Sequence, residues 1–131
     1  MFPKALAVAF IFASSLATAV PLAKRQTFTG DGTFFVPGLG ACGFENTSTQ
    51  LVAALGHIDF DSFSGGNPNP NDNPVCGRQV KASSGGKSVT VEIVDRCAGC
   101  AGEFDLDFSE TAFAALADPS VGRIPITWEF V

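Results

Sequence analysis

The sequence predicts a mainly β fold, a small closed barrel of about six short strands with one or two short helices. Apolar residues alternate with others from Ile124 to Phe130, the pattern of a strand with one buried face. A Gly-rich segment at 83–87 separates two further β-type segments and predicts a hairpin. Because such short strands leave unpaired edges in an open sheet, we expect them to close into a barrel.

The first strands are predicted in the N-terminal half. Residues 27–35 end in Thr33-Phe34-Phe35, β-branched and aromatic types that suit a strand. Asp31 and Thr33 lie two residues apart in this segment, so their side chains should share one face. A second, buried strand is expected at Leu51–Leu55, a continuous apolar run with polar neighbours.

The C-terminal half supplies the hairpin, a helix and the last strand. Residues 78–82 and 88–95 flank the Gly-rich turn, and alternation predicts that Val89, Val91 and Ile93 face the core. Ser109 is a favourable N-cap for a helix through Leu116, which Asp118-Pro119 ends. Alternation also places Trp128 in the core.

Between the halves, residues 60–73 form a long loop rich in Gly, Pro and Asn, a type of loop that often binds or covers a site.

The N-terminal segment has the features of a secretion signal. A short basic start precedes an apolar run at 5–19 that ends in Ala17-Thr18-Ala19, the small-x-small pattern of signal peptidase sites. We expect residues 1–19 to be a signal peptide and residues 20–25 a propeptide ending in Lys24-Arg25. Residues 26–131 would then form one secreted, extracellular barrel domain.

The charge balance argues against two classes of partner. Without residues 1–25 the chain keeps five basic and thirteen acidic residues, a net charge of −8. Nucleic acids and anionic membranes are bound through clustered Lys and Arg, so neither is an expected partner. We expect no cofactor and a monomer. His57 is the single histidine, and a zinc site needs four convergent ligands, so no metal is predicted.

The four cysteines predict two disulfides, for which three connectivities are open. A bridge from Cys42 to Cys76 would tie down the long loop. Cys97 and Cys100 have the spacing of a redox motif beside Arg96, yet secretion favours a structural bridge. Asn46-Thr47-Ser48 is an N-glycosylation sequon, which predicts that this loop faces solvent.

The strongest site signal is the polar stretch at 94–109. Asp95, Asp105 and Asp107 lie within it, together with Arg96 and the close cysteine pair. Carboxylates are rarely buried without partners, so packing alone does not explain this density. Clustering should raise the pKa of at least one carboxyl, and Asp107 is the candidate proton donor. Asp105 and Asp107 could instead bind backbone N–H groups near the helix start.

Six motifs follow one another along the chain: Gly32–Phe35, Gly38–Gly43, Asn73–Gly77, Val91–Cys100, Asp105–Ser109 followed by Ala112-Phe113, and Gly122–Trp128. In this order they resemble the RlpA-like double-psi β-barrels, and the chain is most similar to the secreted single-domain fungal expansin-related proteins called loosenins. This resemblance covers essentially all of residues 26–131.

The resemblance implies a wall-loosening protein without clear hydrolytic activity. Asp107 stands at the aspartate that expansins require, Asp95 at the second aspartate of the groove, and Thr33 at its threonine. Cys97 replaces a neighbouring aromatic residue of bacterial expansins. We expect a binding groove of Thr33, Asp95, Asp107, Asp31, Phe35 and Phe104, and the disulfide pairs Cys42–Cys76 and Cys97–Cys100.

Three functions stay open at this stage. The first is a non-lytic protein that binds and loosens cell-wall polysaccharide such as cellulose or chitin. The second is a protein-binding module that inhibits papain-type cysteine proteases through loops 38–43 and 63–73, as the resemblance to plant-type single-domain barrels implies. The third is a weak endoglucanase, in which Asp31 would be the second carboxylate beside Asp107, because glycoside hydrolysis uses two. Sugar affinity should be weak, because residues 26–131 hold no tyrosine and one tryptophan.

Overall fold

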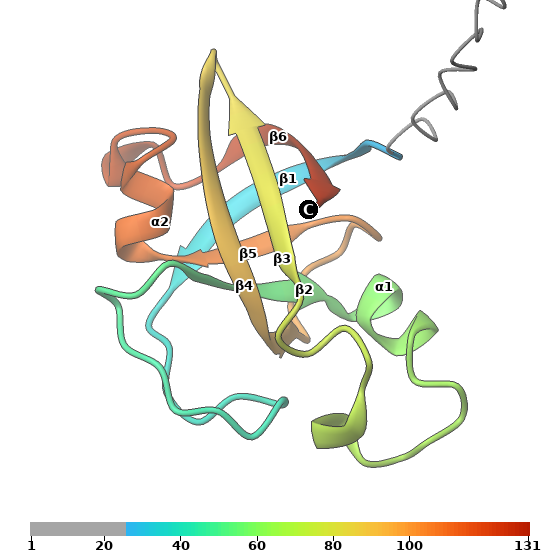
Figure 1. Cartoon of the computed structure of the whole chain (residues 1–131). Coiled ribbons are helices and arrows are strands. Elements are labelled where there is room, and N and C mark those ends of the chain that lie inside the picture. The colour runs from blue at the N-terminus through green and yellow to red at the C-terminus, as the bar shows by residue number, and fades with distance from the viewer. Residues whose placement is uncertain (1–25) are drawn as a thin grey trace, which may run out of the picture.

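The computed structural model describes residues 26–131 as a closed six-stranded barrel (Figure 1). This architecture confirms the predicted fold class. The strand order around the barrel is β1-β5-β2-β4-β3-β6. The strands are β1 (Phe28–Phe35), β2 (Val52–Gly56), β3 (Gln79–Ser84), β4 (Lys87–Cys97), β5 (Leu106–Ser109) and β6 (Ile124–Phe130).

Two parallel strand pairs organise the barrel. β1 pairs with β5 and β2 pairs with β4, while β5 runs antiparallel to β2 and joins the two pairs. Strands β3 and β6 close the barrel through antiparallel pairing with β4 and β1 and with each other. The register of β1 on β5 sets Thr33 opposite Asp107. Residues 74 positions apart in the sequence thus become neighbours.

The core lies inside the barrel and under the second helix. Trp128 is 1% exposed, and Val89, Val91 and Ile93 are all buried, as alternation predicts. The Trp128 indole N–H donates to the carbonyl oxygen of Phe104 at 2.8 Å, which satisfies a polar group that burial would otherwise leave unpaired.

The hairpin is tighter than predicted. β3 and β4 pair from Gln79 opposite Glu92 to Ser84 opposite Lys87, so only Gly85 and Gly86 form the turn. Both have positive φ, 57° and 80°, which glycine adopts at no steric cost. The strands therefore extend into residues that the sequence analysis left in the loop.

Two helices flank the barrel. α2 (Glu110–Ala114) begins as predicted, because the Ser109 hydroxyl accepts a hydrogen bond from the Ala112 N–H, but it ends two residues before Leu116. α1 (His57–Ser62) corrects the prediction of a loop from residue 60, because Phe60 belongs to this helix and is buried. The remaining loop contains the 3-10 turn η1 (Pro70–Asp72), and η2 (Pro119–Val121) follows α2.

The signal peptide and propeptide predictions concern residues 1–25, which lie outside the described residues. Within residues 26–131, no helix is long and apolar enough to cross a membrane.

Two disulfides cross-link the chain and confirm the expected pairs. Cys42–Cys76 ties the connection between β1 and β2 to the segment before β3, with a sequence separation of 34. Cys97–Cys100 closes a short loop at the end of β4, with a separation of 3. Cys42 is buried in the core cluster, whereas the second bridge borders a cavity described below.

The two bridges should contribute unequally to stability. Chain-entropy arguments give about 4 kcal/mol for a loop the length of Cys42–Cys76 and about 1.5 kcal/mol for one the length of Cys97–Cys100. Replacing each pair by alanines should therefore lower the free energy of unfolding more for the Cys42/Cys76 variant. Urea unfolding followed by circular dichroism measures both losses, and a larger loss for the Cys97/Cys100 variant would contradict this ranking.

Candidate functional site

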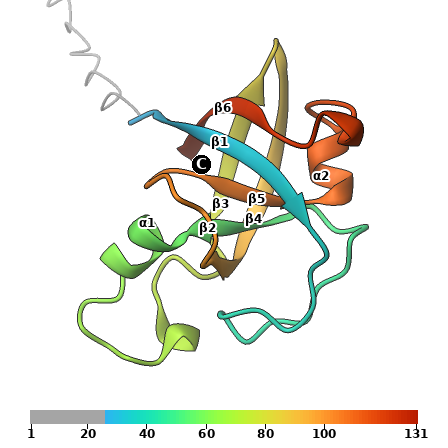
Figure 2. The same ribbon diagram turned by 180° about the vertical axis from the view of Figure 1, so that it is seen from behind.

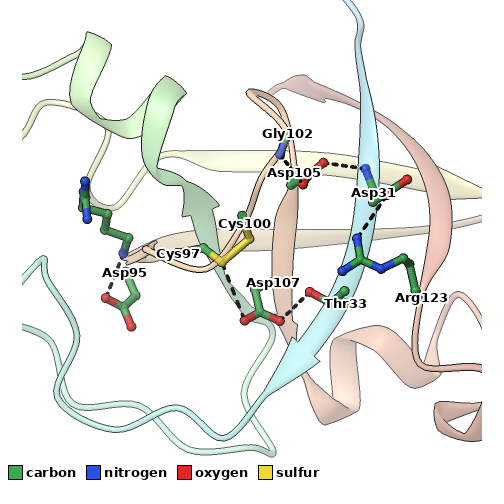
Figure 3. The surroundings of a disulfide bond; sticks show 10 residues. Asp31, Thr33, Asp95, Cys97, Cys100, Gly102, Asp105, Asp107 and Arg123 are labelled. Atoms are coloured by element: carbon green, nitrogen blue, oxygen red, sulfur yellow. Dashed lines mark hydrogen bonds and ion pairs between the residues drawn. A yellow bond between two sulfur atoms is a disulfide. The ribbon is translucent and has the colours of Figure 1, made fainter.

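An open cavity of about 300 Å³ lies on the barrel where β1, β5 and the end of β4 meet. Its wall is mostly polar and includes four aspartates, two arginines and the second disulfide. Figure 3 shows most of these side chains around Asp107. The lining residues are Asp31, Thr33, Phe35, Ala54, Asp95, Arg96, Cys97, Ala98, Gly99, Cys100, Asp105, Asp107 and Arg123.

Asp107 lies at the centre of this site, between Thr33 and the Cys97–Cys100 disulfide (Figure 3). The Thr33 hydroxyl donates to Asp107 Oδ1 at 2.8 Å. Cys97 Sγ lies 3.9 Å from Asp107 Oδ2, and because a disulfide sulfur carries no proton, this is a packing contact. One carboxyl oxygen therefore accepts a hydrogen bond from the protein, while the other makes only this sulfur contact among the described residues.

The pKa of the Asp107 carboxyl is raised above its usual value of 3.8. Partial burial is the main cause, because it disfavours the charged form. The hydrogen bond from Thr33 lowers the pKa, and so does the attraction to Arg123. Repulsion from Asp95 raises it further. Clustering with Asp95 and Asp105 predicted a raised pKa. Desolvation is the larger cause, and the repulsion from Asp95 is the part of the clustering that contributes.

Asp95 anchors a loop rather than standing free in the groove. Its Oδ1 accepts hydrogen bonds from the Ala41 N–H and the Arg96 N–H, both at 2.8 Å. Gly40 permits this approach, because a Cβ there would lie 2.6 Å from the Val94 carbonyl oxygen. Asp95 thus joins the cavity wall to the β1–β2 connection.

Asp105 binds backbone N–H groups, as one reading of the sequence predicted, but these belong to β1 and to the loop before β5 and not to the helix start. It is buried, and its two oxygens accept hydrogen bonds from the Asp31 N–H at 2.9 Å and the Gly102 N–H at 2.8 Å. A Cβ on Gly102 would come within 2.8 Å of this carboxylate, so glycine is required at that position. Asp105 therefore holds β1 against the segment before β5.

Asp31 shares a face with Thr33 as predicted, but its carboxylate is paired. Arg123 Nη1 donates to Asp31 Oδ2 at 3.0 Å in an ion pair that is half-exposed. Arg123 had no predicted role, because this pair depends on the register that sets Asp31 opposite Pro125. Arg123 directly precedes the predicted last strand, but the pairing of that strand with the first one could not be read from the sequence.

Only one of the two predicted groove aromatics borders the cavity. Phe35 does. Phe104 does not, which corrects its placement in the groove: its ring packs against Phe28, with the ring centroids 4.8 Å apart. Residues 98–105 form an irregular loop before β5, so strand alternation could not place Phe104.

His57 and Asn46 lie outside the cavity, whereas Arg96 borders it. His57 begins α1 and is partly buried. Arg96, which borders the cavity, makes a two-point ion pair with Asp61 at 2.8 Å for each hydrogen bond. The loop holding the Asn46 sequon is mostly exposed, and the Asn46 side chain is partly buried with its amide donating to Gln50. Among residues 26–131, no group of three His, Cys, Asp or Glu side chains could hold a metal ion.

The comparison with protein families assigns the chain. The family model described as lytic transglycolase, an RlpA-like double-psi β-barrel, matches residues 28–128. The chain belongs to this family of double-psi β-barrels.

Two curated relatives are similar over most of the chain. The papain inhibitor of Streptomyces mobaraensis is 36% identical over 110 residues, which cover 81% of this chain and 73% of the inhibitor. A homologue of the allergen Asp f 7 from Arthroderma benhamiae is 38% identical over 96 residues, covering 73% of this chain. The chain spans about a third of that allergen homologue, 31%.

Solved structures agree with this assignment. The Streptomyces papain inhibitor has a TM-score of 0.71 and 34% identity, with 81% of this chain and 94% of the inhibitor covered. A mutant Clavibacter michiganensis expansin in complex with cellohexaose has a TM-score of 0.66 and 25% identity. The match covers 81% of this chain and 50% of the expansin chain. Cerato-platanin 3 of M. perniciosa, at 16% identity and a TM-score of 0.54, shares the fold.

The raised pKa of Asp107 predicts a pH-dependent cost to stability. Between the unfolded-state value of 3.8 and the higher folded-state value, the folded protein binds more protons, so stability falls as the pH rises through this window. Asp107→Asn removes the charge and keeps an acceptor for Thr33. It should raise the melting temperature at pH 7 and have little effect at pH 3.

Asp61→Asn is the matched control for this experiment. Arg96 lowers the pKa of the Asp61 carboxyl, so that variant should be slightly less stable at pH 7 and unchanged well below pH 3.8. Thermal melts of the three proteins from pH 3 to 7 measure these differences. The compared quantity is the melting temperature of Asp107→Asn minus that of the wild type. If this difference were smaller at pH 7 than at pH 3, the assigned cause would be refuted.

Proposed function

We propose that this double-psi β-barrel protein is a secreted, non-lytic binder of cell-wall polysaccharide, and that it loosens contacts between cellulose or chitin chains. The observation that carries the proposal is Asp107, a partly buried carboxyl that faces an open polar cavity with one oxygen held and the other available. Sugars are recognised through hydroxyl groups, which donate well to a carboxylate in a partly desolvated site.

The expansin complex supports this choice of ligand. That protein, at 25% identity over 81% of this chain, has been solved with the glucose oligomer cellohexaose. The mostly polar cavity of this chain suits the same class of ligand. Thr33, Asp95 and Asp107 would form its hydrogen-bonding surface, with Phe35 and Asp31 at the edge.

The contacts of the other three aspartates favour binding of the polysaccharide without cleavage. Hydrolysis needs a second carboxylate that serves as nucleophile or activates water. Asp31 is held by Arg123, Asp95 accepts from two backbone N–H groups, and Asp105 is buried between two more. Each is engaged in holding the fold or in an ion pair, which disfavours the endoglucanase alternative.

The affinity of the protein for isolated polysaccharide chains should be modest. Trp128 is buried, Phe104 is packed on Phe28, and Phe35 is the one aromatic residue of the cavity wall. Flat aromatic faces supply much of the apolar contact in tight binding sites, and this cavity has little of it.

Inhibition of papain-type cysteine proteases is the second candidate function. It is favoured by the similarity to the Streptomyces papain inhibitor, because the structural match covers 94% of the inhibitor chain. Both functions are compatible with an extracellular protein processed after residues 19 and 25, acting as a monomer without a cofactor. Two disulfides among the described residues support an oxidising compartment.

The test is a pull-down with amorphous cellulose and with chitin, comparing the wild type with Asp107→Asn. A hydrogen bond to a charged group contributes about 1.5 to 3 kcal/mol, so the variant should bind at least about tenfold more weakly. Asp118→Asn is the control, since it makes the same charge change on an exposed turn outside the cavity and keeps the cap that Asp118 gives Ser120.

The supernatants of the same incubations test for cleavage. The wild type should release no reducing sugar while it increases fibre swelling. Release of reducing sugar that Asp107→Asn abolishes would establish the endoglucanase instead. Equal binding by the wild type and by Asp107→Asn would remove the cavity from the binding surface.

A further inference from the structure

The connection between β1 and β2, residues 36–51, carries half of the exposed large apolar side chains. Eight such side chains are found among residues 26–131, and four of them lie within this segment. Val36 is 82% exposed and Leu39 is 72% exposed. The other two are Phe44 and Leu51. A gathering of this kind on a small domain indicates an interaction surface.

The segment, here called the apolar loop, is held in one conformation. Its backbone turns back on itself through hydrogen bonds from Gly40 N to Phe44 O and from Asn46 N to Gly38 O, both 3.1 Å. Gly43, at φ 82°, permits the turn, and Cys42 bridges to Cys76. A loop that is ordered before binding loses little conformational entropy when it binds.

The loop projects from the barrel below β1 and β2 in both ribbon views (Figures 1 and 2). It meets the polar cavity at Asp95, whose carboxylate accepts a hydrogen bond from the Ala41 N–H. The apolar side chains are therefore presented beside the cavity and are not part of its wall.

The chemistry of the loop fits a protein partner better than a polysaccharide. Glu45 is its one charged residue, in a chain with a strongly acidic balance. Protein interface cores are likewise depleted of charge and rich in apolar contact. Its most exposed side chains, Val36 and Leu39, are aliphatic and lack the flat face that stacks on a sugar ring. A protruding apolar loop instead fits a concave cleft.

We propose that the apolar loop docks into the active-site cleft of a papain-type cysteine protease, with Val36 and Leu39 as its anchors. The match to the papain inhibitor spans 81% of this chain. A match of that length must include residues 36–51. This inference rests on the second candidate function and is independent of polysaccharide binding. It also selects between the two loops considered from the sequence.

The other loop, residues 63–73, offers no comparable anchor. Phe63 packs edge-on against Phe130 at 5.9 Å between ring centroids. The rest of that loop consists of Ser, Gly, Asn, Pro and Asp, and none of its side chains is among the exposed large apolar ones. It supports the apolar loop through the Cys42–Cys76 bridge at its end.

The test is inhibition of papain by the folded protein, measured as an inhibition constant. The double variant Val36→Ser/Leu39→Ser should inhibit at least about 30-fold more weakly, the loss expected when an interface anchor is truncated. Val121→Ser/Val131→Ser is the matched control, because both valines are 57% exposed and lie outside the loop. That control should inhibit like the wild type.

Three results would overturn the proposal: no inhibition by the wild type at micromolar concentration, equal inhibition by the loop variant, or cleavage of the loop by papain as an ordinary substrate. Circular dichroism and the cellulose and chitin pull-downs of the same variants accompany the assay. A folded loop variant that loses polysaccharide binding and keeps inhibition would assign the loop to the sugar surface. Failure of the wild type to bind polysaccharide, with inhibition intact, would leave the docking proposal standing.

Discussion

The parallel pairing of β1 with β5 is the constraint on which the site depends. It sets Thr33 opposite Asp107 and brings the hydroxyl within 2.8 Å of the carboxylate. Neither residue has this environment in an isolated strand, since they lie 74 positions apart. The barrel around them is closed by hydrogen-bonded strands and filled by a core that includes Trp128, so their geometry is fixed by the whole fold.

The same arrangement separates four neighbouring aspartates into different roles. Asp105 is buried between two backbone donors, Asp95 fastens a loop, and Asp31 pairs with Arg123. The pKa of Asp107 is raised, mainly because its carboxyl is partly buried. Sequence spacing alone does not separate such roles, since they depend on which donors the fold brings near. A desolvated carboxyl of this kind lowers stability at neutral pH, a cost often found at binding sites.

Much of the fold was predictable because its signals are local. Alternation identified β6 and the buried position of Trp128, and a capping serine located the start of α2. Helix α1 was missed because residues 57–62 have no periodicity long enough to indicate a helix, and burial of Phe60 stabilises it. Phe104 and Arg123 were misplaced or overlooked, because their neighbours are set by strand register and by a loop.

The barrel thus presents two chemically distinct surfaces that meet at Asp95, a polar cavity and an apolar loop. The central claim is that Asp107 is a desolvated carboxyl that contacts sugar hydroxyls. Carboxyl-carbon NMR titration of Asp107, with and without a soluble cello- or chito-oligosaccharide, tests it most directly. We expect a pKa above 3.8 in the free protein and a shift of the Asp107 resonance on adding the sugar. A pKa at or below 3.8, or a resonance that the bound oligosaccharide leaves unchanged, would contradict the proposed role.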